Sequence, residues 1–83
     1  MRFTAQQIRE IVDFMDNVGF QSEEEELPEV LVFSAHAEEK YERQDVAFEA
    51  IRQINNLVNR FPYVRAELDT TVDDRIYIYI THV

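Results

Sequence analysis

Carboxylates are the side chains whose number and spacing in this sequence could carry chemistry. Seventeen Asp and Glu residues stand against eight Lys and Arg, which gives a formal net charge of −9 at pH 7. Residues 1–49 hold thirteen acidic and four basic residues, whereas residues 50–83 hold four of each. The negative field therefore comes from the first half of the chain, where it would repel nucleic-acid phosphates and attract a basic partner.

Ten of these carboxylates form the predicted partner-binding surface, a negative array that occupies a basic groove as phosphates would. They are Asp13 and Asp16 on the first predicted helix, Glu23, Glu24, Glu25, Glu26 and Glu29 after it, and Glu38, Glu39 and Glu42 beyond the first strand. The last two groups flank that strand, so we expect them near opposite poles. The competing interpretation is a solvated face that only keeps the domain soluble.

A second candidate surface is aromatic. Alternation in the last third of the chain predicts that Tyr63, Tyr77 and Tyr79 lie on the sheet face away from the helices, with Arg65 nearby. Tyr and Arg are enriched in interface hot spots, so this face is a candidate interface with a partner or a second copy. The competing interpretation is cross-strand pairing that simply stabilises an open sheet.

The remaining reactive residue types assemble no catalytic or metal-binding pattern. Ser34 and His36 share one strand face, but that arrangement alone supplies neither an oriented base nor an oxyanion site. Cys is absent and Gly occurs once, which excludes thiolate chemistry and a glycine-rich phosphate loop. Zinc and EF-hand spacings are missing as well. We therefore expect no enzymatic activity, no cofactor and no metal.

Two helices must position these residues. Thr4 and Gln7 form a capping-box pattern ahead of an apolar stripe, and Gly19 supplies a left-handed helix ending. The second helix is predicted over about residues 44–60, and the charged residues 37–43 before it are either a connection or the fraying start of this helix. Its apolar stripe includes Ile51, and Pro62 prevents it from continuing.

Three strands complete the predicted α+β fold, in the order α-β-α-β-β. A doubly apolar strand is expected at 30–35, after an acidic loop at 21–29, and an antiparallel hairpin at 63–69 and 75–83. A right-handed crossover makes the first two strands parallel, so the sheet is mixed. The last strand lies either between them or at an edge, and both helices cover its isoleucine face.

A single domain over residues 1–83 is expected, because a chain of this length supports one modest core. No apolar run approaches the roughly 20 residues of a membrane span, and the N-terminus lacks the apolar stretch of a signal peptide. We therefore expect a protein without membrane contact that is located in the cytoplasm, or in the host cytoplasm if its source is a virus.

In size and bulk charge, though in no motif, the chain resembles small acidic phage proteins that block restriction or CRISPR complexes, as well as some immunity proteins and antitoxins. The resemblance implies an inhibitor that mimics nucleic acid on a basic protein or nucleoprotein complex and binds no nucleic acid itself. The alternative hypothesis is a structural or adaptor subunit that self-associates as a homodimer through the tyrosine-bearing sheet face.

Overall fold

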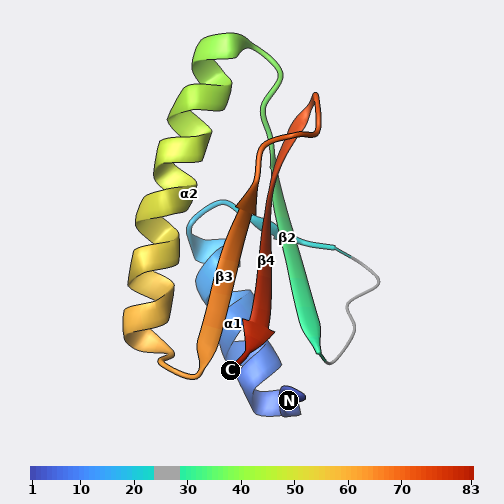
Figure 1. The fold of residues 1–83 in the computed structure, drawn as a ribbon, viewed down its shortest axis with the longest axis vertical. Coiled ribbons are helices and arrows are strands. Elements are labelled where there is room, and N and C mark those ends of the chain that lie inside the picture. Colours follow the sequence, from blue (N-terminus) through green and yellow to red (C-terminus); the bar gives the residue numbers. More distant parts are fainter. Residues whose placement is uncertain (24–28) are drawn as a thin grey trace.

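The computed structural model describes residues 1–23 and 29–83, so the predicted site residues Glu24, Glu25 and Glu26 lie outside the described part. Two helices accompany a four-stranded sheet, which gives an α+β fold as predicted (Figure 1). The elements are α1 (Ala5–Asn17), β1 (Gln21–Ser22), β2 (Val30–His36), α2 (Lys40–Arg60), β3 (Val64–Asp69) and β4 (Arg75–His82).

Local hydrogen bonds fix both ends of α1 as the sequence predicted. The Thr4 hydroxyl accepts from the Gln7 N–H at 3.1 Å, and the Gln7 side chain accepts from the Thr4 N–H at 2.8 Å. At the other end Gly19 adopts φ 91°, and the Phe20 N–H donates to the Met15 carbonyl at 2.9 Å. This Schellman-type ending turns the chain so that Phe20 is buried.

The second helix begins at Lys40, earlier than the predicted start near residue 44, and ends at Arg60. The early start has a local cause, because the Glu39 carboxylate accepts from the N–H groups of Tyr41 and Glu42 at 3.1 and 3.3 Å. A carboxylate at this position satisfies free N–H groups and complements the helix dipole. Of the two interpretations of the charged segment, the structure therefore supports the helix start, since residues 40–43 form the first turn of α2.

The sheet order is β1-β2-β4-β3, and every neighbouring pair is antiparallel. The predicted three-stranded mixed sheet is therefore wrong in strand number and in character, since the sheet has four strands and no parallel pair. The last strand, β4, lies between β2 and β3, which is one of the two positions predicted for it, so β2 and β3 share a direction but do not pair. The additional strand is β1, formed where the chain that leaves Gly19 pairs with the outer edge of β2, within the predicted acidic loop. That pairing satisfies backbone groups that the edge would otherwise expose.

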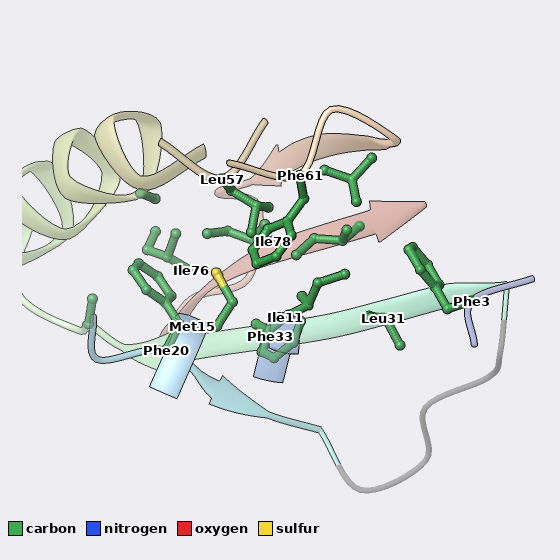
Figure 2. Packing of buried hydrophobic residues seen from close by; sticks show 14 residues of the cluster. Phe3, Ile11, Met15, Phe20, Leu31, Phe33, Leu57, Phe61, Ile76 and Ile78 are labelled. Carbon is green, nitrogen blue, oxygen red and sulfur yellow. The ribbon is translucent and has the colours of Figure 1, made fainter. Parts of the chain in front are cut away.

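One cluster of buried residues joins both helices to one face of the sheet (Figure 2). Leu31 and Phe33 of β2 lie opposite Ile80 and Ile78 of β4, and all four are fully buried. The helices contribute Ile11, Met15, Ala50 and Leu57 to the same cluster. Both helices therefore cover the isoleucine face, as predicted. Neither described helix combines the length and the apolar character that a bilayer span would need.

The buried face of α2 differs from the predicted apolar stripe, because a polar residue is buried and one apolar residue is exposed. Ile51 is 48% exposed, whereas Gln53 is buried among the core residues. Gln53 can be buried because its amide donates to Glu49 at 2.9 Å and accepts from Asn56 at 3.3 Å within the same helix. An apolar side chain is therefore left on the outer surface of α2.

Candidate functional site

One end of the molecule gathers carboxylates from two elements that are far apart in sequence. The Ala37 N–H donates to the Asp74 carbonyl at 2.9 Å, which joins the start of α2 to the β3–β4 turn; both lie at the top of Figure 1. We call the exposed carboxylates at this end the acidic pole, which comprises Glu38, Glu39, Glu42, Asp45, Asp73 and Asp74. Glu38, Glu39 and Glu42 were predicted site residues, whereas Asp45, Asp73 and Asp74 were not.

Arg43 holds the acidic pole together. Its guanidinium donates to the carbonyl oxygens of Ala37 at 2.8 Å, Asp73 at 3.0 Å and Thr70 at 2.8 Å, with a longer contact of 3.4 Å to Arg75. These carbonyls come from the β2–α2 connection, the β3–β4 turn and the start of β4. The donors of this cation are therefore directed at backbone oxygens rather than at carboxylates.

Few of the described carboxylates are neutralised by a cation. Within residues 1–23 and 29–83, ion pairs join Arg2 to Glu29 at 3.1 Å and Arg52 to Glu49 at 2.9 Å, and the His36 ring lies 3.7 Å from Glu38, a contact that is ionic only with a protonated imidazole. All three are exposed, so each contributes little to stability. The acidic pole takes part in only one of them, the long contact from His36.

The other predicted carboxylates lie elsewhere. Asp13 and Asp16 are exposed on α1, and Asp13 lines a groove with Phe14 and Arg60 at the C-terminal end of α2. Because α2 has 21 residues, its two ends are roughly 30 Å apart. Glu29 lies near the N-terminus, away from the pole (Figure 1). The described carboxylates therefore occupy separate regions of the surface.

The sheet face away from the helices carries two of the predicted tyrosines. The rings of Tyr77 and Tyr79 stack with centroids 6.1 Å apart and an interplanar angle of 14°. Burial, followed by the negative charge of Asp69, raises the pKa of Tyr79, whose hydroxyl donates to that carboxylate at 3.5 Å. Arg65 is exposed on this face, opposite Thr81 of β4.

Tyr63 does not share that face, contrary to the prediction. Its ring stacks on His82 with centroids 5.1 Å apart and also contacts Phe3 and Phe61 of the buried cluster. Tyr63 precedes the first residue of β3, so strand alternation does not fix its direction. Burial, followed by the charge of Glu10, raises its pKa, and its buried hydroxyl has no hydrogen-bond partner among the described residues.

Ser34 and His36 point to different partners. The buried Ser34 hydroxyl donates to Glu23 at 2.6 Å and accepts from Arg75 at 3.2 Å, which ties β2 to the neighbouring chain segments. His36 is exposed and lies against Glu38. Within the described ranges, no group of three or more His, Asp and Glu side chains has a geometry that could hold a metal ion.

The pole depends on two features that sequence reasoning missed. Asp73 and Asp74 are acidic like the predicted site residues, so a prediction that included every carboxylate would have found them. No local pattern relates Arg43 to a turn thirty residues away. Comparisons of the chain with protein-family models, curated proteins and solved structures find no match.

Proposed function

We propose that this chain is a non-enzymatic binding protein of the cytoplasm that docks its acidic pole onto a basic surface of a protein or nucleoprotein partner. The observation that carries the proposal is the convergence of six exposed carboxylates at one end, from the β2–α2 connection, α2 and the β3–β4 turn. A cluster of unpaired negative charge attracts a cationic surface at long range and accelerates association at low ionic strength.

Helix capping explains only part of this acidic pole. Glu39 caps α2, and Glu42 accepts from the Glu38 N–H at 2.8 Å, so both carboxylates have a structural task. The side chains of Asp45, Asp73 and Asp74 have no such task in the described contacts. Carboxylates with no structural task are the ones that a binding role accounts for best.

The finer hypothesis of a phage-type inhibitor, a nucleic-acid mimic of the anti-restriction or anti-CRISPR class, requires carboxylates continuous over one surface. The roughly 30 Å length of α2 separates the pole from the carboxylates of α1. This separation favours a local contact at the pole over an extended imitation of a phosphate backbone. We therefore propose a partner with a compact basic patch.

The test removes charge from the pole without touching the caps. The immobilised wild type should capture proteins from native lysate and release them as the salt concentration rises. The triple variant Asp45→Asn, Asp73→Asn and Asp74→Asn should fail to capture these proteins. The matched control removes three charges from α1, through Glu10→Gln, Asp13→Asn and Asp16→Asn, and should retain them. Equal capture by both variants, or capture that does not respond to salt, would refute the proposal.

A further inference from the structure

The outer edge of β3 has no strand partner in the part of the chain that the structure describes, because β3 ends the sheet order. The Val83 N–H donates to the Tyr63 carbonyl at 2.7 Å, so the odd-numbered residues bond toward β4. The backbone N–H and C=O groups of Ala66 and Leu68 therefore point outward. Such an unpaired edge is a template for another strand.

An exposed apolar flank of α2 lies beside this edge. Ile51 supplies this flank and is 48% exposed, whereas Phe48 lies on the outer surface of the helix, nearly opposite the buried Ala50. Ile51 precedes Arg60 by nine residues, or 2.5 helical turns, so the two project from opposite sides of α2. Arg60 faces the groove shared with α1, and α2 packs on β3 and β4. Because α1 contacts β1 at the opposite end of the sheet, Ile51 faces away from α1 and toward the outer side of β3.

The charges along β3 are self-complementary in one antiparallel register. With Ala66 opposite Ala66 of a second copy, Arg65 lies opposite Glu67 of that copy, and the same pair recurs across the two-fold axis. Moving the register by one step, centred on Arg65 or on Glu67, places a like charge opposite itself. Opposite charges in cross-strand pairs stabilise a sheet and like charges destabilise it, so one register is favoured.

We propose that two copies of this chain form a dimer by pairing their β3 strands about Ala66, which makes one continuous eight-stranded sheet. Four backbone hydrogen bonds follow: two between the Ala66 residues, and one from each Leu68 N–H to the Val64 carbonyl across the axis. The Val64 N–H takes no part, because it already donates to the Phe61 carbonyl at 3.0 Å. The side of α2 that bears Ile51 packs against the same side of α2 in the second copy.

We propose a second copy as the partner because the apolar flank of α2 and the charges of β3 are both self-complementary. A two-fold interface brings the same patch together, so one apolar flank covers the other and Arg65 meets Glu67 twice. This interface differs from the tyrosine face expected from the sequence, since Tyr77 and Tyr79 stay uncovered on the far side of the sheet. The formal charge of −9 per copy opposes association, so the measurement belongs at physiological ionic strength.

The test is a charge swap measured by sedimentation equilibrium of the purified chain. Arg65→Glu and Glu67→Arg should each weaken the dimer by about tenfold, because each creates two like-charge pairs. The double variant restores opposite charges and should return the dissociation constant to within about threefold of the wild type. A double variant weaker than both single variants would overturn the proposed register.

Two further variants test the backbone and the helix. Ala66→Pro removes an outward N–H without breaking a bond to β4, and Ile51→Lys charges the apolar flank. Both should abolish the dimer while circular dichroism and thermal melting remain those of a folded chain. A wild type that stays monomeric up to about 1 mM would overturn the proposal. So would a dimer that these variants leave intact but that Tyr77→Ser or Tyr79→Ser abolishes.

Discussion

Replacing Arg43 with Met should destabilise the fold more than the same replacement of an arginine that is exposed on the surface. The guanidinium joins α2 to the β2–α2 connection through the Ala37 carbonyl at 2.8 Å, and to the β3–β4 turn through the carbonyls of Asp73 at 3.0 Å and Thr70 at 2.8 Å. Methionine keeps most of the side-chain stem but removes every donor. The carbonyl of the buried residue Ala37 then has to find water or remain unpaired.

The size of the effect follows from the number and exposure of these bonds. A partly buried hydrogen bond from a charged donor contributes about 1.5 kcal/mol, and each of the two exposed ones about 0.5 kcal/mol, because water can replace them. The sum is a loss of about 2.5 kcal/mol, which in a domain of this size lowers Tm by roughly 10–20 °C. Arg43→Lys should lose about half as much, since one ammonium cannot reach all three carbonyls.

Urea unfolding followed by circular dichroism measures this loss, with thermal melting as a second readout. The matched control is Arg52→Met on the outer side of the same helix, where Arg52 pairs with Glu49 at 2.9 Å and is 68% exposed. That variant should stay within about 0.5 kcal/mol of the wild type. If Arg43→Met unfolds at the same urea concentration as Arg52→Met, the role assigned to the Arg43 contacts is wrong.

Two further predictions concern side chains with unusual surroundings. Tyr63→Phe removes a buried hydroxyl without a described partner, so its Tm should equal or exceed that of the wild type; a clear fall in Tm would show that the hydroxyl is bonded. The Thr71 hydroxyl and N–H bind Asp69 at 2.6 and 2.8 Å and lower the pKa of its carboxyl from the ordinary 3.8. The stabilisation by Asp69 is therefore present above the unfolded pKa and lost as pH falls through the lower folded value. Urea midpoints of the wild type and Asp69→Asn should converge on acidification, and a gap that is constant with pH would contradict this.

Local sequence determined the elements whose cause is local. The ends of α1 follow from the capping box at Thr4 and the left-handed Gly19, because each involves hydrogen bonds within a few residues. Alternation of Ile76, Ile78 and Ile80 with two tyrosines determined which face of β4 is buried, since side chains in a strand point to opposite sides. The acidic excess of the first half is also a property of the sequence alone.

Tertiary structure decided what depends on neighbours distant in the chain. The insertion of β4 between β2 and β3, and the pairing of β1 with β2, depend on which edges meet, and no local pattern encodes that. The same holds for the acidic pole, which exists because Arg43 draws the β3–β4 turn onto the start of α2. Composition fixes how many charges the chain carries, but their grouping follows from contacts between residues thirty positions apart, which only the folded chain brings together.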